Sequence, residues 1–84
     1  MRYAEFKSEV EDLGFKVANR TSTDYIIDDG PINWIVASVV RREVCAMSTE
    51  YHSNMIDEER LRQIFHLLVK FAQTSIEERH YDDV

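Results

Sequence analysis

The sequence is poor in the residues that interrupt or cross-link a chain. It contains two glycines, one proline and one cysteine among 84 residues. So little glycine and proline argues against a low-complexity or disordered chain. The single cysteine, Cys45, cannot form an internal disulfide, and this favours a reducing compartment. We therefore expect a folded, cytoplasmic protein.

Long apolar runs and excess positive charge are also missing. Apolar stretches such as 34–37 are far shorter than the roughly 20 residues of a membrane helix, and the charged amino terminus does not resemble a secretory signal. Sixteen acidic residues against ten basic ones give a formal charge of −6, which repels phosphate backbones. We expect no membrane partner and no direct binding to nucleic acid.

What is present is enough apolar material for one core. Hydrophobic residues make up 44% of the chain, and a chain of this size buries only about 60 to 65% of its unfolded surface. We expect one α+β domain over 1–76, followed by an acidic and frayed tail over 77–84.

Helices are predicted at both ends of the chain. Tyr3, Phe6, Val10 and Leu13 recur at helical spacing, which predicts a helix over 2–13 that ends at Gly14. Asp57 is an N-cap candidate for a longer helix over 57–73. One face of that helix is predicted to hold Leu61, Ile64, Phe65, Leu68, Phe71 and Ala72. A capping box over 74–77 suggests a further short helical piece.

The middle of the sequence predicts an antiparallel meander of three to four strands. Segments 15–19 and 24–28 have aromatic and β-branched content around a polar turn, and Asp28-Asp29-Gly30-Pro31 is the strongest turn signal. Segments 32–40 and 44–49 supply the remaining strand material. The predicted fold class is α+β, with a short antiparallel sheet flanked by the two helices, in the order α-β-β-β-β-α.

The segment 32–40 is the predicted interaction surface. Its alternating sets are both apolar, with Trp34, Val36 and Val40 on one side and Ile35, Ala37 and Val39 on the other. If both helices cover the same face of the sheet, the second set stays exposed in a monomer. This favours a protein partner or a homo-oligomer. Trp34 on its own is interpreted as a core anchor.

No arrangement of residues predicts catalytic, cofactor-binding or metal-binding chemistry, and we expect no small-molecule ligand. His52, His66 and His80 fall in a loop, on a polar helix face and in the tail, whereas a metal site needs three or four convergent ligands. Cys45 is interpreted as a small buried hydrophobe. The paired carboxylates lie at turns and caps, and the two glycines are isolated. The loop residues Tyr51, Met55 and Ile56 form either a recognition patch or, as we favour, a hydrophobic staple against Leu61.

Two stretches, YAEFKSEVEDLGFKV and LRQIFHLLVKFAQTSIEER, resemble small proteins encoded by phages and prophages of Gram-positive bacteria such as lactobacilli, listeriae and streptococci. NWIVASV and MSTEYHSNM fit that pattern more loosely, and Ser75 stands where the group commonly has proline. The resemblance implies a phage accessory protein without assigned catalytic residues.

Three functions are open at this point. The leading hypothesis is a non-enzymatic protein that acts by protein–protein interaction or self-association. The alternative is an acidic decoy that binds a host protein at its nucleic-acid site. The third is a small enzyme that uses Cys45 or a carboxylate pair, which we disfavour because no orienting constellation is visible.

Overall fold

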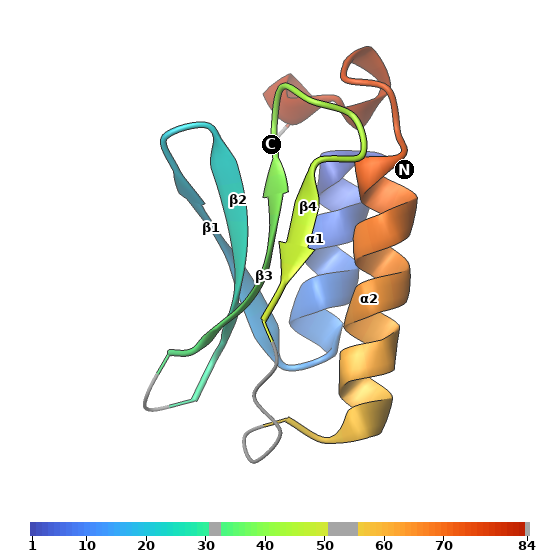
Figure 1. Cartoon of the computed structure of the whole chain (residues 1–84). Helices are drawn as coiled ribbons and strands as arrows, with labels where there is room; N and C mark the ends of the chain where they lie inside the picture. The colour runs from blue at the N-terminus through green and yellow to red at the C-terminus, as the bar shows by residue number, and fades with distance from the viewer. Residues whose placement is uncertain (31–32, 51–55, 84) are drawn as a thin grey trace.

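The computed structural model of the chain describes residues 1–30, 33–50 and 56–83. Four antiparallel strands form one sheet in the order β1-β2-β3-β4, preceded by helix α1 and followed by helix α2. Both helices lie on the same side of the sheet (Figure 1). The predicted α+β class and its α-β-β-β-β-α order are confirmed.

Helix α1 spans Tyr3–Asp12 and buries the side chains of Tyr3, Phe6 and Val10, which share one face because their spacing matches the helical period. Leu13 is the C-cap, and Gly14 follows with φ +90°. Residues with a Cβ rarely adopt this positive φ, whereas glycine does so at little steric cost. Gly14 therefore lets the chain turn directly from α1 into β1.

The first two strands, β1 (Phe15–Arg20) and β2 (Thr23–Asp28), form a tight hairpin in which Arg20 pairs with Thr23. The two-residue connection requires a positive φ, which Thr21 supplies at +61°. The sheet continues through β3 (Ile35–Val40) to β4 (Met47–Thr49). Both later strands are shorter than the sequence predicted, and residues 31–32 of the predicted third strand lie outside the described part of the chain.

A β-bulge in β3 overturns the strict alternation predicted for this strand. Ile26 pairs with Ala37 and Ile27 pairs with Ile35, so Val36 has no direct partner across the ladder. An extra residue of this kind bends the strand and redirects its side chains. Val36 therefore joins Ala37 and Val39 in the buried core cluster beneath the helices, instead of lying on the opposite side with Val40.

Helix α2 spans Glu58–Ala72, and the Asp57 side chain caps it by accepting the Arg60 backbone N–H at 3.1 Å. Its buried face presents Ile64, Leu68, Phe71 and Ala72 to the sheet and to α1. The Phe71 ring stacks on Phe6 with 4.3 Å between the ring centroids. The core thus lies between the two helices and one face of the sheet.

The chain after α2 is more ordered than the predicted frayed tail. Glu77–Arg79 and Tyr81–Asp83 are two 3-10 helices. Arg79 has no exposed surface, and the Tyr81 ring lies 4.9 Å from the Tyr3 ring. The described part of the segment 77–84 is therefore packed onto the domain.

Two single-residue interpretations are also wrong. Trp34 is only partly buried, lies outside the core cluster and precedes β3, which begins at Ile35. Cys45 is exposed in the turn between β3 and β4, with φ +64°. Neither residue therefore anchors the core.

Candidate interaction groove

The face of the sheet opposite the helices is the first candidate surface. Of the six predicted interaction residues, Val36, Ala37 and Val39 are buried in the core, while Trp34, Ile35 and Val40 keep partly exposed side chains. The structure therefore places only three of the six where a partner can reach them.

This outer face is neither fully apolar nor widely exposed. Ile27 is 4% exposed although it lies outside the helix-covered core cluster. The Ser38 and Ser48 hydroxyls hydrogen bond to each other at 3.0 Å, and the Arg20 guanidinium lies 5.8 Å from the centre of the Tyr25 ring. Neighbouring side chains thus cover much of the apolar surface, which is the usual state of an open sheet face.

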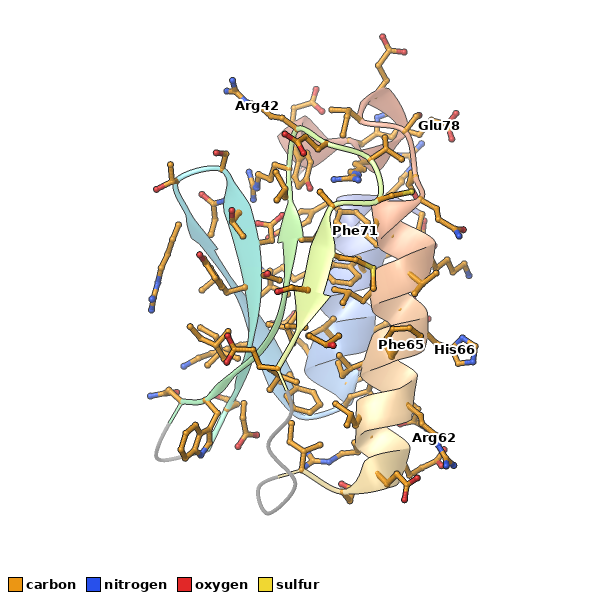
Figure 2. All side chains as sticks on the ribbon, viewed as in Figure 1. Arg42, Arg62, Phe65, His66, Phe71 and Glu78 are labelled. Carbon is orange, nitrogen blue, oxygen red and sulfur yellow. The ribbon has the colours of Figure 1, made fainter. Side chains whose placement is uncertain are left out.

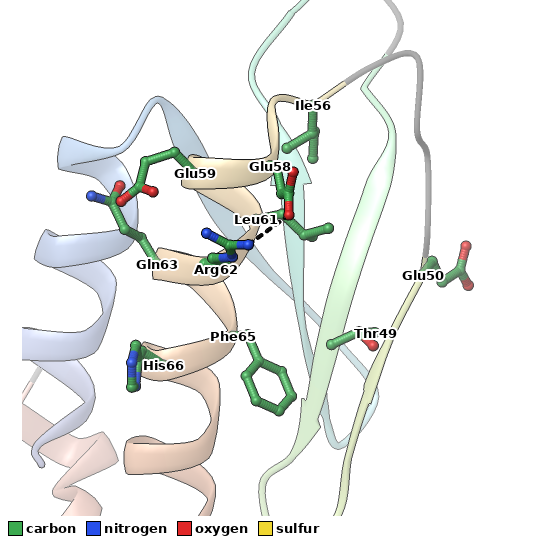
Figure 3. Close-up of a pocket in the computed structure, with 10 residues that line it drawn as sticks. All are labelled: Thr49, Glu50, Ile56, Glu58, Glu59, Leu61, Arg62, Gln63, Phe65 and His66. Carbon is green, nitrogen blue, oxygen red and sulfur yellow. Dashed lines mark hydrogen bonds and ion pairs between the residues drawn. The ribbon is translucent and has the colours of Figure 1, made fainter.

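A groove between α2 and β4 is the stronger candidate. Phe65 is 50% exposed there, although the helical stripe predicted it on the buried face of α2. Its ring points into the space between the helix and the strand, toward Thr49 (Figure 3). The groove encloses about 830 Å³. Its lining comes from the end of β4, the residue before the cap of α2 and the first half of α2: Thr49, Glu50, Ile56, Glu58, Glu59, Leu61, Arg62, Gln63, Phe65 and His66.

Phe65 is exposed because it follows Ile64 directly in α2. Successive helical residues point about 100° apart, so both side chains cannot face the centre of the same contact. Ile64 has no exposed surface, and Phe71 points between the sheet and the helices (Figure 2). Phe65 is left at the margin of the buried stripe, beside the edge of the sheet.

The other wall of the groove is an edge strand. The Val40 N–H donates to the Ala46 carbonyl at 2.9 Å, and the Glu50 N–H donates to the Val36 carbonyl at 2.8 Å. Hydrogen-bonded positions alternate along an antiparallel ladder, so the backbone groups of Met47 and Thr49 point away from β3. β4 is the last strand of the sheet. Its outer N–H and C=O groups therefore form an open edge beside Phe65.

Charged groups surround this apolar centre. Arg62 Nη2 lies 2.6 Å from Glu58 Oε1, an exposed ion pair one turn apart on α2 (Figure 3). The lining contains three glutamates, one arginine and one histidine, His66. The groove is therefore an apolar strip whose lining also carries more acidic than basic side chains.

Arg60 fixes the helical wall of the groove to the rest of the domain. Its guanidinium contacts Asp57 Oδ1 at 2.7 Å, donates to the Leu13 carbonyl at 3.2 Å and lies 5.0 Å from the centre of the Phe15 ring. The hydrogen bonds from the Arg60 side chain and backbone lower the pKa of Asp57. The start of α2 is thus tied to the turn between α1 and β1.

A second cluster, of polar residues, lies near the hairpin end of the sheet. Arg41 Nε contacts Asp24 Oδ1 at 2.9 Å, and the Arg41 guanidinium lies between the rings of Tyr3 and Tyr81, 5.1 Å and 4.3 Å from their centres. Burial and the nearby charge of Asp24 raise the pKa of both tyrosines. Burial alone would lower the pKa of Arg41, but the hydrogen bond and charge of Asp24 outweigh it and raise the pKa.

This cluster is structural in character because Asp24 and Arg79, its two central charged residues, are buried. Asp24 has no exposed surface, and its Oδ2 atom has no hydrogen-bond partner among the described residues. The adjoining Arg79 guanidinium donates to six acceptors at 2.9 to 3.4 Å: the carbonyls of Val40, Arg41, Glu43, Ala72 and Thr74 and the hydroxyl of Tyr81. A buried cation surrounded by acceptors holds chain segments together and offers no surface to a substrate.

The remaining candidate residues do not converge. His66 lines the groove, His80 is partly buried after the first 3-10 helix, and His52 lies outside the described residues together with Tyr51 and Met55. Within the ranges that the structure describes, no group of three or more His, Cys, Asp or Glu could hold a metal ion. None of the helices in those ranges is long and apolar enough to cross a membrane.

Ile56 partly confirms the interpretation of the loop before α2. It is 8% exposed and belongs to the core cluster, against which Leu61 also packs, as a hydrophobic staple requires. Both residues also line the groove. The recognition patch and the staple are therefore compatible at this position.

Sequence reasoning missed the groove itself. The signal that could have indicated it is the adjacent pair Ile64 and Phe65, because only one of two neighbouring large residues can face the core. Comparison of the chain with protein-family models, with curated proteins and with solved structures finds no match in any of the three. The resemblance to phage proteins therefore stays a prediction, and the function has to be inferred from the geometry of the groove.

Proposed function

We propose that this protein is a non-enzymatic interaction module that binds another protein through the groove between α2 and β4, in keeping with a phage or prophage accessory role. The observation that carries the proposal is Phe65, a large aromatic side chain that is half exposed beside an open strand edge. Aromatic side chains in partly formed pockets are typical anchors of protein interfaces.

The energetics of Phe65 support this role. Full burial of a phenylalanine side chain is worth about 1.5 to 3 kcal/mol, and folding alone obtains roughly half of that here. A partner that covers the ring gains the rest. Leu61 and Ile56 extend the same apolar strip, so a partner can bury a continuous surface.

The test compares two charge substitutions at equally exposed apolar positions. Phe65→Glu changes the groove, whereas Val44→Glu changes a 48% exposed residue in the turn between β3 and β4. Both variants and the wild type serve as baits in quantitative affinity capture from a bacterial host lysate. We expect proteins that bind the wild type and Val44→Glu equally but are depleted at least about tenfold with Phe65→Glu, since about 1.4 kcal/mol of lost contact suffices for that change. The proposal fails if no captured protein depends on Phe65.

The acidic decoy remains the second proposal. Exposed carboxylates on both helices favour it: Glu5, Glu9, Glu11 and Asp12 on α1, and Glu58 and Glu59 on α2. Recovery of a nucleic-acid-binding protein whose complex weakens steeply with salt would support it. Recovery of Phe65-dependent proteins that do not bind nucleic acid would refute it.

A further inference from the structure

The proposed function leaves the form of the partner open. Taking that function as given, we infer that the groove binds an extended, basic segment of the partner, which adds to the sheet as a fifth strand beside β4. The segment carries two apolar residues separated by one polar residue, with lysine or arginine next to them. Three features of the groove lead to this partner.

The first feature is the outward-facing backbone of β4. Met47 and Thr49 direct their N–H and C=O groups away from β3, and no described strand lies beyond them. An antiparallel strand at this edge would exchange two pairs of N–H to C=O hydrogen bonds with them. A helix satisfies its own backbone internally and would leave these groups to water.

The second feature is the side-chain direction that the register imposes. Met47 and Thr49 pair with Val39 and Ala37, whose side chains are buried on the helix side of the sheet. Residues directly opposite one another in an antiparallel ladder point to the same face. The two residues of an added strand that pair with Met47 and Thr49 would therefore face α2 and meet Phe65. The residue between them would face away, on the side of Ser48.

The third feature is charge, which separates a foreign segment from a second copy of this chain. The lining holds three glutamates against one arginine, and the whole chain has a formal charge of −6. Edge-to-edge pairing of two copies would bring the glutamates of both grooves close together, and repulsion between these like charges would weaken the pairing. A segment with lysine or arginine gains attraction at the same place.

The experiment uses a displayed library of random twelve-residue peptides. The library is selected on the full-length protein and depleted on Phe65→Glu, with Val44→Glu as the matched control that must retain binding. We expect the enriched peptides to share two apolar residues at positions i and i+2 and a neighbouring lysine or arginine. Synthetic peptides with single N-methylated amides then report the backbone pairing.

The pattern of N-methylation effects identifies strand addition. Methylation of an amide that donates to β4 should weaken binding at least about tenfold, because it removes a hydrogen bond and adds a steric clash. Methylation of the intervening amide should change binding less than about twofold. The effect should therefore alternate with a period of two residues.

Other results would overturn the inference. Enriched peptides with apolar residues at i, i+3 and i+4 would indicate a helical partner, and acidic peptides would contradict the charge argument. A dimer in sedimentation that Phe65→Glu abolishes would make the occupant a second copy. A Phe65-dependent protein captured from lysate without any enriched peptide would indicate a folded partner surface. In the last case the proposed function survives while this inference fails.

Discussion

The hairpin end of the sheet and its β4 edge differ in which kinds of group are buried and which are exposed. Near the hairpin end, Arg79 is buried and its guanidinium donates hydrogen bonds to six acceptors. These acceptors belong to the end of β3, the β3–β4 turn, the end of α2 with the segment just after it, and the second 3-10 helix. At the β4 edge, the aromatic ring of Phe65 is exposed and two residues of backbone face outward. In the first region, hydrogen bonds between buried polar groups link distant segments of the chain. The second leaves apolar and backbone groups available for a partner.

The difference shows that the burial of a side chain here depends more on which chain segments pack around it than on whether the side chain is polar or apolar. Arg79 is buried because the last described segment crosses the end of the sheet, where carbonyls of the β3–β4 turn and of α2 need donors. Phe65 is exposed because, among the described residues, no strand beyond β4 packs against it. Three stability experiments test this contrast, from the largest expected effect to the smallest.

The largest effect is expected at Arg79. Arg79→Met fills the space but leaves buried carbonyls without donors, which should cost about 3 to 5 kcal/mol of unfolding free energy. Arg42→Met removes the same charge from an exposed site and should change stability by less than about 0.5 kcal/mol. Urea titration followed by circular dichroism measures both.

A variant that still folds keeps this prediction testable. Arg79→Lys retains the charge with three donors instead of five and should lie between the wild type and Arg79→Met. If Arg79→Met is as stable as Arg42→Met, the C-terminal segment does not hold the fold as the structure indicates.

An intermediate effect is expected from alkaline pH at the same end. The pKa of Tyr3 and of Tyr81 is raised above the ordinary value of 10.0. A raised pKa means that the protonated form is favoured in the folded state, so its stabilising contribution is complete below pH 10 and is lost as the pH rises toward the folded-state value. The free energy of unfolding should fall in this range.

Removing both hydroxyls tests the assignment of this pH dependence. The double variant Tyr3→Phe with Tyr81→Phe should lose less stability than the wild type between pH 10 and pH 12, in urea titrations at fixed ionic strength. If the free energy of unfolding falls equally steeply with pH in the double variant and the wild type, the role of the two buried tyrosines is contradicted.

The smallest effect is expected at Phe65. Phe65→Ala should lower the unfolding free energy by about 1 kcal/mol or less, because the ring is half exposed and alanine favours the helix. Phe71→Ala, at a fully buried position of the same helix, should cost about 3 to 5 kcal/mol. Thermal and urea unfolding measure the pair, and similar losses at both positions would place Phe65 in the core.

Much of the fold could be predicted because its signals are local. The spacing of Tyr3, Phe6 and Val10 defines a helix, Gly14 ends it, and Asp57 starts the next one. Each signal depends only on neighbouring residues, so it can be recognised without knowing the rest of the molecule. The antiparallel order follows as well, since short connections join strands that lie next to each other.

The sequence by itself thus determined the element order, the turn at Gly14 and the cap of α2 at Asp57, whereas the predicted capping box over 74–77 does not form, because Ile76 precedes the first 3-10 helix without a side-chain cap. Only the tertiary structure decided that Val36 turns inward at a bulge, that Arg79 is buried and that Phe65 is exposed at the edge of β4. The reason is physical: a bulge depends on the register between two strands, and burial depends on which distant segments meet. Neither is encoded in the spacing of residues along one element.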